Sequence, residues 1–308
     1  MSSRLSRNHR AFSSATLAWG LLVLGTSCRM TAEPSRVIAL LTDYGTHDFY
    51  AGVLEGSILR VNPAARISTI THEIEPFDIR EGSYVLAQAA PAYPAGTVFV
   101  AIVDPGVGTA RRPIVLRSAD GTLFVGPDNG LFSEVLRRFE IVDAYEITSR
   151  DLCQPRSSTF HGRDIFGPVG AHLSRGVEPS MVGPAIDASK LVRLTSAVPT
   201  AHGDTLSGEI VHVDRYGNLI TNIPRAMTTG LQPGERYHLM TRDSVAPVTV
   251  GQTYGDVPVG EFVVLVNAEG AVEIAANTAS AAALCGVRAG DPVALAPAAL
   301  PGRIATPN

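Results

Sequence analysis

The sequence has few cysteines, no dense stretch of basic residues and no apolar segment long enough to cross a membrane as a helix. Three cysteines in 308 residues exclude a disulfide-rich scaffold. With 25 Lys and Arg against 29 Asp and Glu, the net charge of −4 argues against a nucleic-acid surface. The segment THEIE at residues 71–75 lacks a second histidine at helical spacing, so we expect no metal site. A small molecule is therefore the expected partner.

The first 35 residues have the order of a secretory signal peptide. Three arginines precede the apolar residues 15–24, and small residues then lead to Cys28. The box at residues 25–28 (GTSC) resembles a bacterial lipoprotein cleavage site, although its first residue departs from the usual Leu. We expect an exported, periplasmic or membrane-anchored protein with a lipid anchor at Cys28, or a cytoplasmic one if the start codon is wrongly chosen. Only Cys153 and Cys285 would then remain, as one disulfide or two free buried thiols.

The first half of the chain alternates apolar strands with amphipathic helices. We expect strands at residues 37–41, 67–71, 97–103, 113–117, 122–125 and 141–147. Helices are expected from an N-cap at Asp48 to residue 61, at residues 78–90, up to Arg138, and from His161 towards Leu173. The Asp120-Gly121 pair predicts a hairpin. This alternation predicts an α/β domain with a mostly parallel sheet and helices on both faces.

The pattern changes in the second half. Residues 185–204 have the prolines, Ser and Thr of a linker. Short alternating runs follow at residues 207–213, 236–240, 248–250, 261–266 and 271–274, and these predict a smaller antiparallel sheet or barrel. We therefore divide the chain into an export segment (1–35), an N-terminal α/β catalytic domain (36–195) and a C-terminal β-barrel-like domain (205–300).

Charged residues gather where the strand at residues 97–103 ends. Asp104 and Arg111 lie in the glycine-rich loop VDPGVGTARRP, and His161 lies in STFHGRD. Ligands of open α/β sheets bind at the carboxyl ends of the strands. The loop lacks the third glycine of a dinucleotide fingerprint and the Gly-Lys-Ser/Thr ending of a phosphate loop. It either directs Asp104 and Arg111 into a cavity or is a capped strand end with a surface arginine, and His161 is either a base or a structural histidine.

Two further turns carry polar residues that permit a functional and a structural interpretation. Asp43 and Asp48 flank a glycine turn, where carboxylates could hold ribose hydroxyls or an amino group. Asp214 and Asn218 lie across a second turn, and an asparagine amide can bind the edge of adenine. Equally, residues 216–218 could form only a turn with a positive φ at Gly217.

Six segments together resemble one family, the S-adenosyl-L-methionine (SAM) hydroxide adenosyltransferases. These are adenosine-forming SAM hydrolases and relatives of fluorinases and chlorinases. In chain order the segments are TDYGTHD, HEIEPFDIREGSYVLAQ, GTVFVAIVDPGVGTARRP, VGPDNGLF, STFHGRDIFGPVGAHL and VDRYGNLITNI. The resemblance implies an N-terminal α/β domain, a C-terminal β-barrel-like domain and a homotrimer with active sites between the N-terminal domain of one subunit and the C-terminal domain of the next. SAM is then the substrate, and no cofactor is implied.

The resemblance assigns a catalytic triad to Asp104, Arg111 and His161, with Arg112 as a weaker candidate. The 5′ carbon of SAM carries a sulfonium, so the leaving group departs neutral and only a nucleophile is missing. Water is a poor one, because its pKa is about 15.7. Arg111 would stabilise developing hydroxide, His161 would accept or relay the proton, and Asp104 would orient the pair.

The same resemblance assigns the contacts with the substrate. They are Asp43 for the ribose hydroxyls, Asp48 and Asp214 for the amino group of the methionine part, Asn218 for the adenine, and Asn277 and Ala279 for the adenine pocket. Ala268 and Glu269 depart from the family pattern, because the halogenating relatives have Ser and Arg there. The binding of the methionine carboxylate is therefore left open.

A halogenase and a non-catalytic binding protein are the alternatives to SAM hydrolysis. A halogenase would have to hold a halide beside Asp104, and the repulsion at about 4 Å amounts to about 4 kcal/mol at an effective dielectric constant of about 20. Gly162 also lacks the hydroxyl that the fluorinase uses. A non-catalytic exported lipoprotein that binds SAM or adenosine is suggested by the export signal, because SAM is a cytosolic metabolite.

Overall fold

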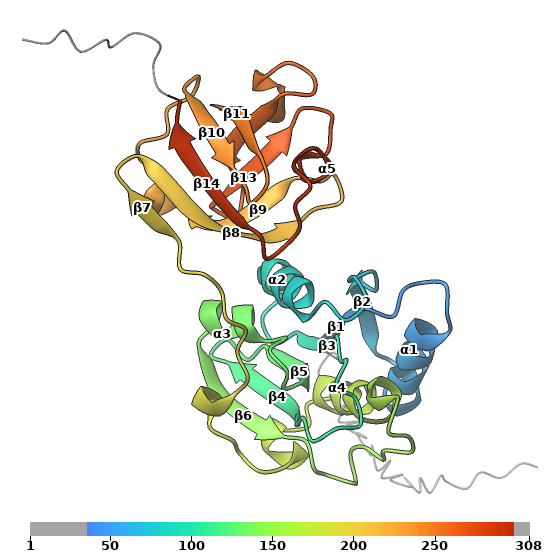
Figure 1. Cartoon of the computed structure of the whole chain (residues 1–308). Coiled ribbons are helices and arrows are strands. Elements are labelled where there is room, and N and C mark those ends of the chain that lie inside the picture. Colours follow the sequence, from blue (N-terminus) through green and yellow to red (C-terminus); the bar gives the residue numbers. More distant parts are fainter. Residues whose placement is uncertain (1–35, 299–308) are drawn as a thin grey trace, which may run out of the picture. The chain divides into compact units, whose positions relative to one another are not determined.

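The computed structural model describes residues 36–298 (Figure 1). The expected export segment and Cys28 lie outside these residues. None of the helices in residues 36–298 combines the length and the apolar composition of a membrane-spanning segment. Cys153 and Cys285 are both buried and free, so of the two alternatives the structure has free thiols.

The N-terminal sheet has six strands within the described residues, in the order β2-β1-β3-β5-β4-β6. Their bounds are β1 Val37–Thr42, β2 Arg66–Thr71, β3 Val98–Ile102, β4 Pro113–Ser118, β5 Leu123–Pro127 and β6 Ile141–Glu146. The pairs β2–β1, β1–β3 and β3–β5 are parallel, whereas β4 is antiparallel to both β5 and β6. The predicted mostly parallel sheet is confirmed, and β4 and β5 form the predicted hairpin.

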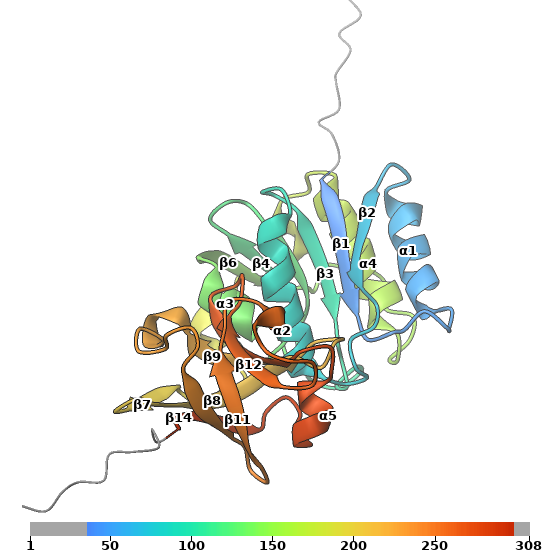
Figure 2. The ribbon, with the colours of Figure 1, turned by 90° about the horizontal axis from the view of Figure 1, so that it is seen from above.

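Helices cover both faces of this sheet (Figure 2). They are α1 Tyr50–Val61, α2 Ile79–Ala89, α3 Ser133–Arg138 and α4 Gly167–Ser174. One apolar core joins α1 and α4 to the sheet, and a second joins α2 and α3 to its other face. Asp78 caps α2 by accepting a 2.9 Å hydrogen bond from the Glu81 N–H. The prediction that Asp48 caps α1 is wrong, because the helix begins later and Phe49 occupies the N-cap position without a side-chain bond.

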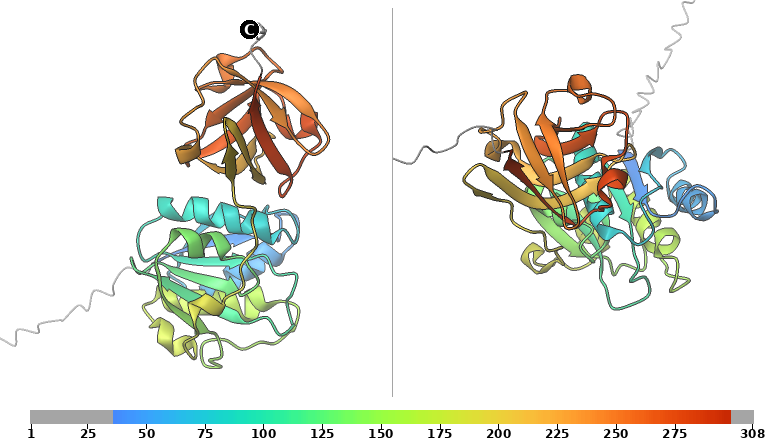
Figure 3. Two further views of the ribbon diagram at one scale, coloured as in Figure 1. Left: turned by 60° about the vertical axis from the view of Figure 1, so that its left-hand side comes forward. Right: turned by 45° about the horizontal axis from the view of Figure 1, so that its top comes forward.

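The C-terminal strands close into a barrel (Figure 3). They are β8 Thr205–Val213, β9 Leu219–Pro224, β10 Arg236–Met240, β11 Val245–Val250, β12 Phe262–Val266, β13 Ala271–Ala276 and β14 Pro292–Pro297. Pairing of β14 with both β10 and β8 closes the barrel, and β11–β12 is a parallel pair. The expected barrel-like fold is confirmed. The short strand β7 Thr200–His202, at the end of the expected linker, pairs with β8, and α5 Ala281–Cys285 precedes β14.

Candidate active site

The residues of the expected triad lie beyond the end of β3. Every residue of β3 is buried, so a charged side chain can follow only after the strand ends, and Asp104 does so. The loop that begins there approaches the segment leading to His161. Gly108 has a φ of +78°, and a Cβ at this position would lie 2.3 Å from the carbonyl oxygen of Ser158. A glycine is therefore required where the two segments meet.

Asp104, Arg111 and His161 form one hydrogen-bonded chain with Arg111 in the middle. Arg111 donates to Asp104 through Nε, 2.9 Å from Oδ1, and through Nη2, 2.5 Å from Oδ2. The same Nη2 lies 2.7 Å from Nδ1 of His161. The structure thus brings the three residues together, although they come from segments about 50 residues apart.

The Asp104–Arg111 ion pair is buried, since the two side chains keep 5% and 7% of their exposure. The guanidinium carbon of Arg111 lies 5.2 Å from the ring centre of Phe166, within the range of a cation–π contact. Nη1 of Arg111 is buried and has no hydrogen-bond partner among residues 36–298. An unsatisfied buried donor costs about 1–3 kcal/mol, so this nitrogen is suited to bind an oxygen atom that is not part of the chain.

His161 immediately precedes the π-helix Gly162–Phe166, which continues as α4. Single π-helical turns occur frequently at functional sites. A guanidinium has only donors, so Nδ1 of His161 accepts and the ring proton lies on Nε2. Burial and, after it, the charge of Arg111 lower the pKa of His161 below its ordinary value of 6.5. At neutral pH the ring is therefore uncharged.

A cavity of about 410 Å³ opens beside the triad. Asp104 and His161 line it together with Asp43 and Asp48. Asp48, which does not cap α1, is one of the lining residues. The cavity has the size of a small-molecule site and carries several carboxylates, which suits a ligand with hydroxyl and cationic groups.

Asp43 occupies the carboxyl end of β1 and is held by the backbone. Its Oδ2 accepts a 3.0 Å hydrogen bond from the N–H of Phe77. Burial is the main cause that raises the pKa of Asp43, and this hydrogen bond opposes the shift. The carboxylate thus lies in a site of reduced solvation, where a hydrogen bond from a ligand hydroxyl gains strength.

Aromatic residues that the sequence prediction did not assign also line the cavity. They are Tyr44, Tyr50, Phe77 and Phe160. The rings of Tyr44, Tyr50 and Phe160 contact one another, with centroids 5.3 to 6.0 Å apart. Phe77 has 71% of its surface exposed. Three of the four lie within segments that resemble the family: Tyr44 in TDYGTHD, Phe77 in HEIEPFDIR and Phe160 in STFHGRD. These segments could have identified the aromatic residues, but only the charged residues beside them were assigned a role.

The four predicted binding residues of the C-terminal domain do not line this cavity. Asp214 accepts bonds from the N–H groups of Tyr216 and Asn218 and from the Asn218 side chain, each at 2.9 Å. Gly217 has a φ of +84°, as the turn interpretation expected, and a Cβ there would lie 2.0 Å from the Ser280 hydroxyl oxygen. The turn therefore packs against the segment of Asn277 and Ala279, and the four residues gather at one end of the barrel.

The weaker candidates have structural partners. Arg112 is tied to Asp128, with Nη2 2.6 Å from Oδ2, and is not part of the triad chain. His72 has its Nδ1 2.9 Å from the hydroxyl of Thr42. Within residues 36–298, no group of three or more His, Cys, Asp or Glu side chains is arranged to hold a metal ion.

Two family models match the chain. The SAM hydroxide adenosyltransferase N-terminal domain matches residues 38–183, and the corresponding C-terminal domain matches residues 208–294. The (R)-S-adenosyl-L-methionine hydrolase of Salinispora tropica is 41% identical, covering 84% of this chain and 97% of that protein. The enzyme of the same name from Thermus thermophilus is 35% identical over 84% of this chain and 99% of its own.

More distant relatives and a solved structure agree with these matches. A fluorinase of Actinoplanes sp. is 29% identical, covering 85% of this chain and 97% of the fluorinase. The crystal structure of an uncharacterised conserved protein from Thermotoga maritima superimposes with a TM-score of 0.80 at 36% identity, over 84% of this chain and all of the other. The likeness therefore extends over both domains.

Proposed function

The chain belongs to the SAM hydroxide adenosyltransferase family, and from this premise we propose that it hydrolyses SAM to adenosine and L-methionine. Hydrolase relatives are 35–41% identical to this chain over the aligned residues, whereas fluorinase relatives are 28–29% identical. The ion pair with Arg111 largely compensates the charge of Asp104, so that charge alone does not exclude a halide. The higher identity with the hydrolases favours water over a halide as the nucleophile.

In the proposed reaction, the water oxygen attacks the 5′ carbon of SAM in line with the carbon–sulfur bond. A carbon–oxygen bond forms, and the carbon–sulfur bond breaks with its electron pair staying on sulfur. Methionine leaves as a neutral thioether, and one proton is released. Catalysis then depends on holding the water in line and on removing its proton, and each of these contributes to the rate.

The single observation that carries this proposal is the unpartnered Nη1 of Arg111, at the centre of the chain that joins Asp104 to His161. Arg111 is fixed on two sides, by Asp104 through Nε and Nη2 and by His161 through Nη2. Its remaining donor group is therefore preorganised to bind an oxygen atom. A preorganised donor is among the strongest contributions to catalysis where charge develops beside it.

The proton of the attacking water passes to Asp104 in this proposal. The oxygen becomes strongly acidic as it bonds to carbon, so a carboxylate that lines the cavity is a sufficient base. His161 is the poorer acceptor, because its single acceptor nitrogen, Nδ1, already accepts from Arg111, whereas each carboxylate oxygen of Asp104 can accept more than one hydrogen bond. Its role is to hold Arg111, and this requires the uncharged ring.

We also assign the contacts with the substrate by resemblance to the family. Asp43 and Asp48 line the cavity that would receive the ribose and the amino group. Asp214, Asn218, Asn277 and Ala279 would complete the site from a neighbouring subunit of a homotrimer. Two features support this: within the described residues the cavity is lined only by residues 43–162, and the ring of Tyr216, beside Asn218, is 78% exposed.

The direct test is to incubate the purified protein with SAM and to follow adenosine and methionine by chromatography. We expect equimolar products, and in ¹⁸O-labelled water the label should appear in the 5′ hydroxyl of adenosine. Tight SAM binding without turnover would support the non-catalytic binding protein instead. Turnover that requires halide and yields a 5′-halogenated adenosine would support the halogenase.

A further inference from the structure

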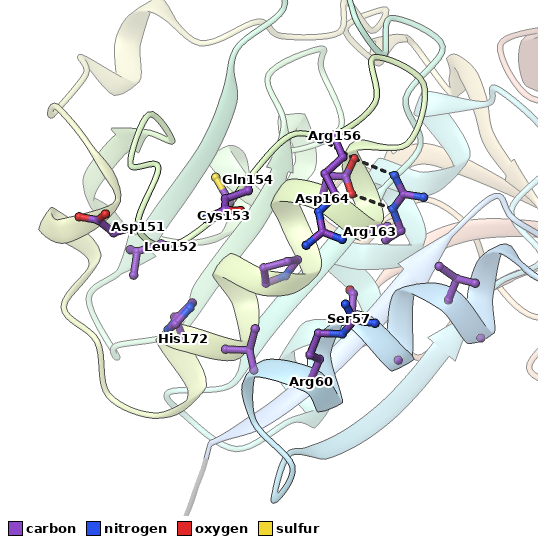
Figure 4. Close-up of a pocket in the computed structure, with 15 residues that line it drawn as sticks. Ser57, Arg60, Asp151, Leu152, Cys153, Gln154, Arg156, Arg163, Asp164 and His172 are labelled. Carbon is purple, nitrogen blue, oxygen red and sulfur yellow. Dashed lines mark hydrogen bonds and ion pairs between the residues drawn. The ribbon is translucent and has the colours of Figure 1, made fainter.

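A second cavity, of about 670 Å³, lies between α1, α4 and the loop at residues 151–156 (Figure 4). It shares no lining residue with the active-site cavity. No step of the proposed reaction uses it. Its walls come from three separate segments of the N-terminal domain.

Each of these segments contributes an arginine. Arg60 belongs to the last turn of α1, Arg156 to the loop, and Arg163 to the π-helix that precedes α4. In Figure 4 the side chains of Arg156 and Arg163 lie on one side of the cavity, and Arg60 extends from α1 on the other. The lining is therefore rich in guanidinium groups that face the same space.

Only one of the three guanidinium groups is neutralised. Arg163 forms a two-point ion pair with Asp164, at 2.7 and 2.9 Å. Asp164 also accepts 3.0 Å hydrogen bonds from the N–H groups of Arg156 and Ser157, so both of its oxygens already have donors within the chain. Among residues 36–298, no hydrogen bond or ion pair holds the guanidinium of Arg60 or of Arg156. The guanidinium groups of Arg60 and Arg156 therefore remain available to a ligand. Among the lining residues, the acidic side chain other than Asp164 is that of Asp151, which is exposed.

The remaining lining leaves room for a ligand beside these cations. A Cβ on Gly52 or on Gly56 would have no neighbouring atom within 4 Å, so the wall formed by α1 is open. Burial, followed by the charge of Arg175, lowers the pKa of His172, which leaves an uncharged ring that can donate one N–H. These features suit a ligand of several atoms with oxygens on more than one side.

We propose that this cavity binds a phosphate-bearing anion with at least two negative charges. A guanidinium presents planar donors that match phosphate oxygens two at a time, and two such groups on opposite walls match a ligand with oxygens on both sides. A diphosphate group fits this arrangement, either as inorganic pyrophosphate or as part of a nucleotide. The site is distinct from the SAM site and does not depend on the proposed reaction.

The test is calorimetric titration of the full-length protein with pyrophosphate, and in a parallel arm with ADP, at low ionic strength. The variant is the double substitution Arg60→Ala with Arg156→Ala. The control is Arg66→Ala with Arg236→Ala, which removes two exposed arginines on other elements. We expect one pyrophosphate per chain on the wild type and on the control, and at least tenfold weaker binding by the variant. Tighter binding of ADP than of pyrophosphate, if the double variant loses it, would identify a nucleotide as the source of the diphosphate.

The proposal is overturned if the wild type does not bind pyrophosphate, or if the variant binds it as well as the control does. It is also overturned if saturating adenosine displaces pyrophosphate, because the anion would then lie in the active-site cavity. Circular dichroism melting of the variant and the control shows whether both are folded. If the double variant unfolds, the single substitutions Arg60→Ala and Arg156→Ala, each at an exposed position, provide the same comparison.

Discussion

The backbone N–H of Phe77 donates a 3.0 Å hydrogen bond to the carboxylate of Asp43, from a residue whose φ is +70°. A non-glycine residue in this region stores strain of about 1–3 kcal/mol, which persists only where the surroundings enforce it. The same backbone conformation holds the exposed Phe77 ring at the mouth of the cavity. The strained backbone of Phe77 therefore positions both its own ring and the carboxylate of Asp43 at the cavity.

Replacing Phe77 by glycine should separate stability from function. Glycine adopts a positive φ without cost, and the exposed ring contributes little to the core, so the melting temperature should stay the same or rise. The KM for SAM should rise about tenfold, because aromatic contacts of this kind contribute about 0.5–1.5 kcal/mol beyond the area they bury. Steady-state kinetics measures the change in KM, and thermal melting measures the change in stability. A normal KM would mean that the ring does not contact the substrate.

The acid limb of the pH–activity profile should reflect His161. Its pKa lies below 6.5, and the protonated ring would present an N–H to Arg111 in place of an acceptor. Activity should therefore persist as the pH falls to 6.5 and decline only at lower pH, as His161 takes up its proton. The measurement is kcat/KM between about pH 4.5 and 8.

The variant His161→Gln provides the control for this assignment, because glutamine does not titrate. Its residual activity should lack that limb. A limb that stays at the same pH would have to be assigned to another group of the cavity, for which Asp43, with its raised pKa, is the first candidate.

Much of the fold could be predicted from local pattern. The apolar residues of β3 and the Asp120-Gly121 turn can be recognised from their local sequence alone. The structure has the predicted strand and the predicted hairpin at these positions. The strands β9 and β14 were missed for a physical reason. Polar residues Thr221 and Asn222 interrupt the apolar pattern of β9, and β14 is stabilised by pairing with β8, which is far away in the sequence. Barrel closure is a long-range property that no local pattern contains.

The candidate site was predictable in its composition but not in its geometry. The motifs contain Asp104, Arg111 and His161, yet no spacing rule shows that Arg111 lies between the other two. That order depends on the close approach of Gly108 to Ser158, which only the folded chain reveals. The same limit explains why the arginine-lined cavity could not be anticipated from three separate segments.

Arg111→Lys should abolish most of the turnover, whereas Arg112→Lys should have a small effect. A lysine keeps the positive charge but cannot contact Asp104, His161 and a water molecule at once. The loss of one preorganised donor costs about 10²–10³ in kcat. Arg112 is the matched control, because it lies next in sequence and is partnered by Asp128 instead. Equal losses in the two variants would contradict the role assigned to Arg111.

Asp104→Asn should lower kcat by about 10²–10⁴ while SAM binding persists. Asparagine has the same shape but is a much weaker base, and it still accepts a hydrogen bond from Arg111. Asp104→Ala is the less suitable variant, because removing one partner of a buried ion pair costs about 3–5 kcal/mol of stability. Calorimetric SAM binding and single-turnover kinetics separate the two effects. Equal loss of binding and turnover would count against a catalytic role for Asp104.

Subunits with different defects should restore activity when they assemble together, if each site is built from two chains. Asp104→Asn disables the N-terminal half of a site, and Asn218→Ala would weaken the half contributed by the C-terminal domain. In a randomly mixed trimer about a quarter of the sites combine two intact halves, so the co-expressed proteins should reach about a quarter of wild-type activity. Two variants of the same half, Asp214→Ala and Asn218→Ala, serve as the control and should not complement. If the Asp104→Asn mixture is no more active than its components, each site must be completed within one chain.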